Sequence, residues 1–293
     1  MLEVNCVVCG SGKHSVLLVT PDVRYKVTDK EFTLVQCTNC GLIYLNPMPT
    51  ENEIGNYYPK KLYYTESLPS RLYSKIIFRR KYATITNHVR DGKVLDVGCG
   101  TGGLLSLFKS ENWHAYGVEV SKDGCLVAKQ KLGTHVFNCE LRDCRFPSNF
   151  FDVVILNHVL EHMLHPVEEL EEIFRILKNN GILYLSVPNI NSLQFRCTKK
   201  FWFHLDVPRH VYHYLPSTLV SLLKQTGFTL TSKIMFSAID FPLDFFQSLR
   251  AKWFNNRYKL FMPLFLVPLS LVSSFIQLFP AWRGTMVAIL KKT

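Results

Sequence analysis

Apolar runs alternate with amphipathic segments from residue 92 to the end of the chain. Near-continuous apolar runs such as 151–157 predict parallel strands that are covered on both faces. Amphipathic stretches such as 165–180, which has a proline in its first turn, predict the intervening helices. The expected strands are 93–96, 114–120, 135–138, 151–157, 181–189, 228–236 and 284–290. Their alternation with helices predicts an α/β domain built from βαβ units.

Two regions of different character precede this domain. Strand-like runs at 15–20 and 32–36 indicate a small N-terminal unit that ends near residue 50. A connector rich in proline, asparagine and tyrosine follows, and residues 68–89 form a basic amphipathic stretch that we expect to be helical. Its cationic residues are expected on the outer face: Arg71, Lys75, Arg79, Arg80 and Lys81. We therefore divide the chain into residues 1–50, a connecting and helical region at 51–91, and the α/β domain at 92–293.

A glycine-dense turn, G-x-G-x-G-G, follows the first predicted strand of the α/β domain. Gly98, Gly100, Gly102 and Gly103 permit backbone dihedrals that are closed to other residues and allow a ligand to approach the main chain. The G-x-G-x-x-G spacing that places a pyrophosphate on a helix N-terminus is absent. The turn therefore favours a ligand with an adenosine and no phosphates, of which S-adenosylmethionine is the common one, over a dinucleotide.

Acidic residues close the first two strands at positions suited to a nucleoside. Asp96 ends the first strand. Glu119 follows 23 residues later in the sequence, near the separation at which an acidic side chain that ends the second strand meets both ribose hydroxyls. Glu140 and Leu141 follow the third strand, where the carboxylate of Glu140 could accept from the adenine amine and the backbone N–H of Leu141 could donate to the ring. An exposed loop acid explains Glu140 equally well.

Four cysteines form two close pairs in the N-terminal unit. Cys6 and Cys9, like Cys37 and Cys40, have the spacing with which two thiolates hold one Zn²⁺, and four sulfurs complete a tetrahedral structural site. The sequence predicts a zinc ribbon with a long hairpin; a redox dithiol pair and unrelated thiols are the alternatives. Nine cysteines in a chain without an export signal favour thiols and metal over disulfides.

The overall composition fits a folded, basic protein. Hydrophobic residues make up 47% of the 293 positions, which excludes a disordered chain. The formal charge of +11 suits an anionic partner such as nucleic acid, a nucleotide sugar or an acidic membrane surface, but the charge is dispersed, as in an ordinary basic protein. The first residues lack the basic start and apolar core of a signal peptide, so we expect a cytoplasmic protein.

In their order and spacing, these motifs resemble those of class I S-adenosylmethionine-dependent methyltransferases of the bacterial type that carries an N-terminal zinc ribbon. The likeness runs from Cys6 to about Phe236 and rests on the cysteine quartet, VLDVGCGTGG, GVEVS, FDVVILNHVLEHMLHP, LKNNGILYLSVPN and VPRHVYHYLPSTLVSLLKQTGF. It implies a Rossmann-like seven-stranded sheet with an antiparallel last strand and helices on both faces. The expected cofactor-binding residues are Asp96, Gly98, Cys99, Gly100, Gly102, Glu119, Val120, Glu140, Leu141 and Asn157.

Candidate catalytic residues follow the fourth strand. His158, Glu161 and His162 would share one face if this segment is helical. They could line the pocket through hydrogen bonds, supply a general base, or bind a divalent cation. Some quinone-biosynthetic methyltransferases similar to this chain bind metal there with Glu-x-x-Glu-His. His158 replaces the first glutamate, which weakens the metal alternative.

A histidine-rich insert at 201–214 is the second source of candidate bases. Because it follows the fifth strand, we expect it to roof the acceptor pocket. Its polar residues are His204, Arg209, His210, Tyr212 and His213. We take His210 as the first candidate base, and Arg209 could hold an anionic group bidentately. The alternative is a packed loop whose histidines bond to backbone carbonyls.

Residues 260–282 carry no charge and are numerous enough for a transmembrane helix. Three prolines interrupt the stretch, and the strand at 284–290 must rejoin the sheet, so we expect an apolar helical insertion at about 240–282 instead. It could form a substrate lid, a dimer face, or a contact with the inner face of a membrane. The cations expected at its rim are Lys252, Arg257, Lys259 and Arg283.

Taken together, these features predict methyl transfer to oxygen on a small-molecule or glycan-precursor acceptor. A nucleic-acid methyltransferase is the first rival, but Asn157-His158-Val159-Leu160 stands where an Asn-Pro-Pro-Tyr-like base-flipping motif is expected. The second rival is a non-catalytic module that binds S-adenosylmethionine. Intact Asp96, Glu119 and glycines argue against loss of the cofactor site.

Overall fold

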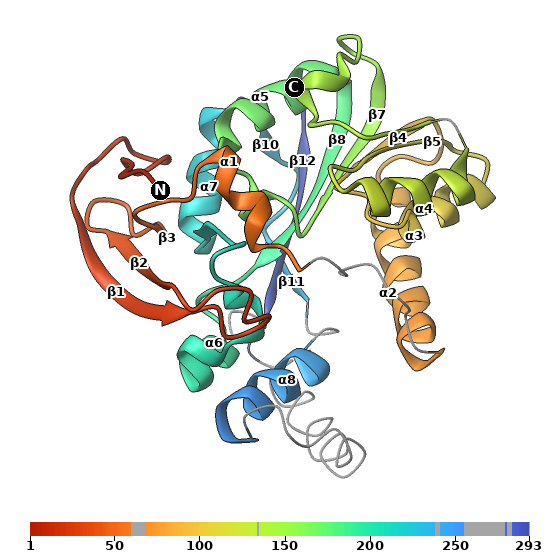
Figure 1. The fold of residues 1–293 in the computed structure, drawn as a ribbon. Coiled ribbons are helices and arrows are strands. Elements are labelled where there is room, and N and C mark those ends of the chain that lie inside the picture. Colours follow the sequence, from red (N-terminus) through yellow and green to blue (C-terminus); the bar gives the residue numbers. More distant parts are fainter. Residues whose placement is uncertain (60–67, 134, 238–240, 255–278, 280–282, 293) are drawn as a thin grey trace.

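A computed structural model describes residues 1–59, 68–133, 135–237, 241–254, 279 and 283–292. Within them, the central sheet has eight strands in the order β10-β12-β8-β7-β4-β5-β6, and β11 also pairs with β12 (Figure 1). The strands are β4 (Lys93–Val97), β5 (His114–Val118), β6 (Val136–Phe137), β7 (Phe151–Asn157), β8 (Leu177–Pro188), β10 (Thr229–Leu230), β11 (Met235–Ser237) and β12 (Thr285–Lys291). Strands β8 to β6 are parallel, and β12 is antiparallel to β8. The expected Rossmann-like α/β fold is confirmed.

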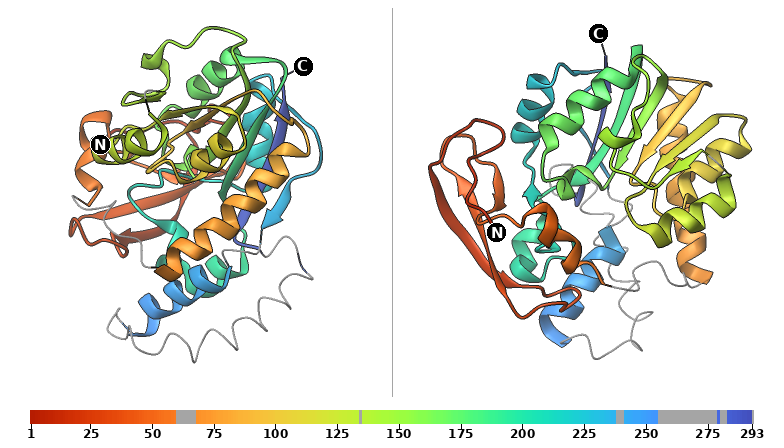
Figure 2. Two further views of the ribbon diagram at one scale, coloured as in Figure 1. Left: turned by 90° about the vertical axis from the view of Figure 1, so that its right-hand side faces the viewer. Right: turned by 45° about the horizontal axis from the view of Figure 1, so that its top comes forward.

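Helices cover both faces of this sheet, because successive side chains of a buried strand point to opposite sides. The main helices are α2 (Leu68–Thr86), α3 (Gly103–Ser110), α4 (Lys122–Leu132), α5 (Pro166–Ile176) and α7 (Pro216–Gln225). Val153 and Ile155 of β7 share a core with α2, α3 and α4. Their neighbours Val154 and Leu156 share the other core with α5 and α7. The two helical layers appear on opposite sides of the sheet in Figure 2.

The remaining helical elements are short or lie at the periphery. They are α1 (Glu51–Ile54), α6 (Leu193–Thr198), α8 (Phe241–Phe254), and the 3₁₀ turns η1 (Gly55–Tyr57), η2 (Arg142–Cys144), η3 (Leu160–His162), η4 (Lys199–Phe201) and η5 (Phe203–Leu205). Of the helical insertion predicted at about 240–282, α8 is described, whereas the uncharged stretch 260–282 lies outside the described residues except for residue 279. No helix among the described residues is long and apolar enough to cross a membrane.

The single strand expected at 228–236 is divided into β10 and β11. Both segments pair antiparallel with β12, at Thr229–Lys291 and Met235–Val287. Between them, the hydroxyl of Thr231 donates to the Ile289 carbonyl at 2.9 Å. Polar side chains that bond to the backbone compete with a regular strand ladder. Thr231 lies where the strand is interrupted, directly after β10.

The N-terminal unit forms its own antiparallel sheet and is completed by the α/β domain. The strands are β1 (His14–Pro21), β2 (Glu31–Cys37), β3 (Ile43–Leu45) and β9 (Tyr212–His213) in the order β1-β2-β3-β9. Strand β9 belongs to the histidine-rich insert, and Tyr44 of β3 pairs with Tyr212. One continuous core contains Phe32 and Tyr44 of this sheet and Leu219 of α7. We call residues 1–50 the ribbon; it is built against the insert that was expected to roof the acceptor.

Candidate functional site

The glycine turn after β4 has the conformation that its sequence predicts. Gly98 and Gly102 have φ angles of 69° and 73°, in the left-handed region. A Cβ atom at Gly98 would lie 2.7 Å from Val159, and one at Gly102 would lie 2.7 Å from Leu132. Gly100 N–H donates to Glu119 Oε2 at 2.7 Å, so the turn folds back onto the end of β5. Only glycine fits a turn this close to its neighbours.

Two buried carboxylates face this turn. The second oxygen of Glu119 accepts the Ser121 N–H at 2.8 Å. Asp96 is only 4% exposed, and its Oδ1 has no hydrogen-bond partner among the described residues. Burial raises the pKa of Asp96 to about 7, although Lys81 opposes the rise and Glu119 adds to it. Asp96 therefore offers a hydrogen-bond acceptor that no residue of the described chain uses.

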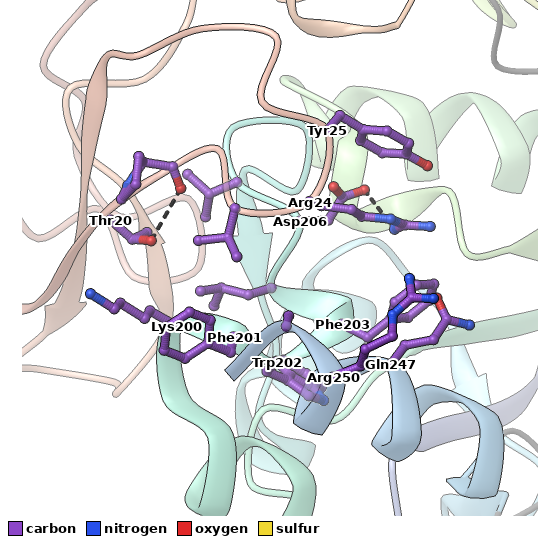
Figure 3. Close-up of a pocket in the computed structure, with 15 residues that line it drawn as sticks. Thr20, Arg24, Tyr25, Lys200, Phe201, Trp202, Phe203, Asp206, Gln247 and Arg250 are labelled. Atoms are coloured by element: carbon purple, nitrogen blue, oxygen red, sulfur yellow. Dashed lines mark hydrogen bonds and ion pairs between the residues drawn. The ribbon is translucent and has the colours of Figure 1, made fainter. Parts of the chain in front are cut away.

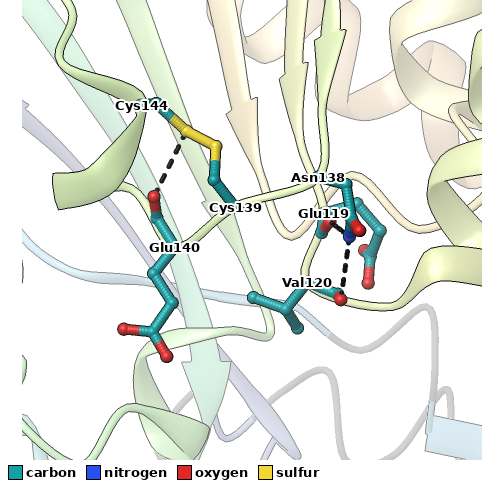
Figure 4. Close-up of a disulfide and its surroundings, with 6 residues drawn as sticks. All are labelled: Glu119, Val120, Asn138, Cys139, Glu140 and Cys144. Atoms are coloured by element: carbon teal, nitrogen blue, oxygen red, sulfur yellow. Dashed lines mark hydrogen bonds between the residues drawn. A yellow bond between two sulfur atoms is a disulfide. The ribbon is translucent and has the colours of Figure 1, made fainter.

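The turn after β6 borders the same site (Figure 4). Asn138 Nδ2 donates to the carbonyls of Glu119 and Val120 at 2.7 and 2.9 Å, which ties this turn to the end of β5. Val120 is 67% exposed. Of the predicted adenine contacts, Leu141 is buried and Glu140 is exposed.

A disulfide joins Cys139 to Cys144 across this turn (Figure 4). The expectation that the cysteines are thiols and metal ligands rather than disulfides is therefore wrong for these two. The physical reason is the tight turn at Glu140–Leu141, which brings the two Cα atoms to 6.0 Å, within the range that a disulfide spans. The bond encloses the two residues predicted to contact adenine.

These residues fit S-adenosylmethionine, the cofactor that the sequence resemblance implies. The unpartnered oxygen of Asp96 can accept from an amine or hydroxyl, and the carboxylate of Glu119 is held at the turn by two backbone N–H groups, where an acid can meet a ribose. Exposed Val120 is an apolar surface that an adenine would cover. Cys99 is buried against β5, so its side chain does not face the turn's open side. We call Asp96, Gly98, Gly100, Glu119 and Val120 the cradle.

Lys81 was expected on the outer face of α2 but points into the site. Its ammonium donates to Asn157 Oδ1 at the end of β7, and the same oxygen accepts from Ser186 Oγ at 2.9 Å. Lys75, Arg79 and Arg80 are exposed, as expected. The outward placement is wrong for Lys81 because the helical period carries this position toward the sheet edge, where the carboxylate of Asp96 attracts it.

His158 and Glu161 form a pair beside Asn157, although their segment is not an α-helix. His158 has a φ of 56°, and a 3₁₀ turn follows at η3. The Nδ1 atom of His158 lies 3.3 Å from Glu161 Oε1, and its ring stacks on that of His204 with centroids 5.6 Å apart. The His158 side chain is 26% exposed, whereas Glu161 is buried. His204 in turn contacts Asp244 of α8 at 2.8 Å.

Burial governs the protonation of this cluster. It raises the pKa of Glu161 to about 7, an effect that nearby His162 partly offsets. Burial lowers the pKa of His162, lowers that of His210 well below its usual range, and lowers that of His213 to about 3. These three histidines are therefore neutral at pH 7, as hydrogen-bonding imidazoles.

His210 is buried, and His162 beside it is partly buried. Their ring centroids are 4.4 Å apart. The Nδ1 atom of His162 lies 3.0 Å from the Arg209 carbonyl, and the Nδ1 atom of His210 lies 2.8 Å from the His204 carbonyl. These contacts match the alternative given for the insert, a packed loop whose histidines bond to backbone carbonyls.

The residues that could together hold a cation differ from the predicted trio. One possible ligand atom from each of Glu161, His162 and His210 lies within 4.8 Å of the others, so this set includes His210 instead of His158.

The guanidinium of Arg209 already binds carboxylates of the protein itself. Arg209 is 1% exposed, and its guanidinium donates to Asp22 of the ribbon, to Asp206 and to the Tyr57 carbonyl. Arg209 does hold anionic groups, as predicted, but these are the carboxylates of Asp22 and Asp206 and not a group of the acceptor. The carboxylates are the protein's own, and they join the ribbon to the insert.

The cysteine quartet is assembled as predicted. Cys6 Sγ lies 3.4 Å from Cys40 Sγ, and Cys9 Sγ lies 3.5 Å from Cys37 Sγ. Tetrahedral Zn²⁺ with Zn–S bonds of about 2.3 Å separates its sulfurs by about 3.8 Å, so small shifts would fit an ion. A hydrogen bond with Asn39 lowers the pKa of Cys9 to about 6, whereas burial raises the pKa values of Cys6 and Cys40. The donor set suits Zn²⁺.

A sequence model described as a methyltransferase domain matches residues 68–233. Among curated proteins, the ubiquinone biosynthesis O-methyltransferase of Glaesserella parasuis is 28% identical over 114 residues, 36% of this chain and 48% of that protein. The ubiquinone/menaquinone biosynthesis C-methyltransferase of Burkholderia mallei is 32% identical over 101 residues, 31% of this chain and 40% of that protein. The chain spans about half the length of the curated relatives it matches.

Solved structures share the fold. A SAM-dependent methyltransferase from Archaeoglobus fulgidus superposes with a TM-score of 0.53 at 21% identity, over 76% of this chain and 95% of that one. At this identity the likeness concerns the arrangement of strands and helices.

Proposed function

This chain belongs to the methyltransferase domain family, and on that premise we propose that it transfers a methyl group from S-adenosylmethionine to a hydroxyl of a small-molecule or glycan-precursor acceptor. When bound, the cofactor supplies a methyl group on a sulfonium, which a nucleophile takes by in-line displacement. The protein must therefore hold the cofactor, orient the acceptor and remove its proton.

The cradle binds the cofactor. Asp96 and Glu119 provide buried oxygens at the ends of two adjacent parallel strands, where ligands of open α/β sheets bind. Lys81 helps to keep Asp96 charged and also bonds to Asn157. Gly98 of the glycine turn is exposed, so a ligand can reach the main chain there.

His158 is the base in this proposal. When Glu161 is ionised, it accepts the Nδ1–H of His158, so the proton-accepting nitrogen is Nε2. The stacked His204, itself fixed by Asp244, holds the plane of the His158 ring. His158 takes the hydroxyl proton as the oxygen attacks, and Glu161 stabilises the imidazolium that forms.

His210, the first candidate from sequence, is less suited to this step. It is 4% exposed, and burial lowers its pKa well below the usual range. We assign His210 and His162, whose rings contact each other close to Glu161, a supporting role. The cysteine quartet, in the same proposal, holds a structural Zn²⁺.

The single observation that carries the proposal is the His158–Glu161 pair, which lies one residue beyond Asn157 on the strand next to the cradle. The test is transfer from ¹³C-methyl-labelled cofactor to pooled sugars, sugar phosphates and phenols, with release of S-adenosylhomocysteine measured in parallel. NMR of the product identifies the methylated atom. An O-methyl product supports the proposal. A methyl group on carbon or nitrogen contradicts it, and cofactor binding without transfer to any acceptor favours a binding module.

A further inference from the structure

A cavity of about 260 Å³ lies where the ribbon meets α8 (Figure 3). Three segments that are distant in sequence line it: residues 20–25 of the ribbon, residues 200–207 of the insert, and residues 247–251 of α8. The cavity shares no lining residue with the cradle. Its ligand can therefore be inferred independently of the proposed methyl transfer.

The lining carries excess positive charge. Arg24, Lys200 and Arg250 contribute cations, whereas Asp206 contributes the only carboxylate among the lining residues that the structure describes. Arg24 donates to Asp206 at 2.9 Å, so this pair is internally neutralised. Lys200 and Arg250 remain as cations that the lining itself does not balance.

Arg250, which lines the cavity, carries a hydrogen-bond donor that lacks an acceptor in the described part of the chain. Its Nε atom is buried and has no hydrogen-bond partner among the residues that the structure describes. A guanidinium N–H that is removed from water without an acceptor is costly, and oxygen anions are its preferred partners. Gln247, one turn earlier on α8, adds an amide donor to the same wall (Figure 3).

Aromatic rings form the rest of the wall and hold Arg24 in place. The Arg24 guanidinium lies 4.0 Å from the centre of the Phe203 ring and 4.8 Å from that of Tyr25. The ammonium of Lys200 lies 5.4 Å from the Phe201 ring. The cavity therefore combines cationic donors with apolar ring faces on which the ring of a ligand can pack.

From this combination we propose that the cavity binds the phosphate group of a phosphorylated small molecule, such as a sugar phosphate or a nucleotide. A phosphate carries close to two negative charges at neutral pH and several acceptor oxygens, which match two unbalanced cations from separate segments. A carboxylate would balance only one of them. The volume admits a sugar-phosphate-sized ligand, and the ring faces hold its non-phosphate part.

The test is calorimetric titration of inorganic pyrophosphate, glucose 1-phosphate and uridine diphosphate into the full chain and three variants. Arg250→Gln and Lys200→Gln remove the two unbalanced cations. Lys199→Gln is the matched control, because Lys199 is exposed, adjacent in sequence and absent from the lining. S-adenosylmethionine is titrated into each sample as a separate measure of the cradle, and thermal melting confirms folding.

We expect at least one probe to bind, with a Kd raised about tenfold by Arg250→Gln and about threefold by Lys200→Gln, and unchanged by Lys199→Gln. Cofactor affinity should be the same in all variants. No binding of any probe by the wild-type chain, or equal weakening by Lys199→Gln, would overturn the inference. Probe binding without cofactor binding would support this site while contradicting the proposed function.

Discussion

Arg209 of the insert holds Asp22 of the ribbon through hydrogen bonds of 2.6 and 3.0 Å, although 187 residues separate them. Both side chains are buried, and the same guanidinium also binds Asp206. Burial by itself would raise the pKa of Asp22, but the hydrogen bonds from Arg209 and two backbone N–H groups lower it overall. The pair therefore fixes the ribbon against the insert as a charged contact.

The substitution Asp22→Asn should destabilise the protein by about 3 to 5 kcal/mol. The buried guanidinium of Arg209 would keep its positive charge but lose one of the two carboxylates that balance it. The free energy of unfolding in denaturant measures this. Glu51→Gln is the control, since it removes an exposed partner of His165 and should cost less than about 1 kcal/mol. Equal effects of the two substitutions would mean that the buried pair is not what fixes the ribbon.

His158→Asn should lower kcat by about 100-fold or more with little change in cofactor affinity, because a general base contributes factors of this size. Asparagine tolerates the positive φ at this position and lacks a basic nitrogen. Glu161→Gln should lower kcat less, since the base remains. His114→Asn changes an exposed histidine at the opposite end of β5 and should have no effect. Retained activity in His158→Asn would exclude this residue as the base.

Removal of zinc should unfold the ribbon before the α/β domain. We expect one Zn²⁺ per chain by elemental analysis, and loss of more than about 3 kcal/mol of stability in Cys37→Ser, because structural zinc contributes directly to folding. Cys197→Ser, which alters an exposed cysteine outside the quartet, should retain both zinc and stability. A wild-type protein that is fully stable without any metal would contradict this assignment.

Cofactor affinity should increase as the pH rises through about 7. Asp96 is protonated below its raised pKa, and its ionised form attracts a cationic ligand. We expect an increase of about tenfold between pH 6 and pH 8. The ligand-free protein should lose stability as the pH rises from about 4 to 7, because the folded state holds this proton more tightly. Asp96→Asn should abolish the trend in affinity and reduce the trend in stability, to which Glu161 contributes because burial also raises its pKa to about 7. A trend in affinity that persists in this variant would assign it to another group.

The sheet and its glycine turn could be predicted because their signals are local. Apolar runs such as 151–157 specify buried strands, and the spacing of Gly98 to Gly102 specifies a turn that only glycine can form. The cysteine quartet is equally local within each pair. These features follow from neighbouring residues, whatever the rest of the chain does.

The contacts that connect distant segments could not be predicted in the same way. Nothing in the sequence of Tyr212–His213 indicates that it extends the ribbon sheet, and nothing links Asp22 to Arg209 before the fold brings them together. The disulfide at Cys139 depends on a turn geometry that spacing alone does not specify. The inward direction of Lys81 depends on where α2 packs, since the charge pattern alone favoured the surface.

The most direct test of the account is calorimetric titration of S-adenosylmethionine and S-adenosylhomocysteine into the wild type, Asp96→Asn, Glu119→Gln and the control Asp123→Asn. Asp123 is an exposed acid in the first turn of α4, close in sequence to the cradle but outside it. We predict micromolar binding by the wild type and by Asp123→Asn, and at least about tenfold weaker binding by the two cradle variants. A folded wild-type protein that binds neither ligand would contradict the assignment of the cradle and the methyl transfer proposed from it.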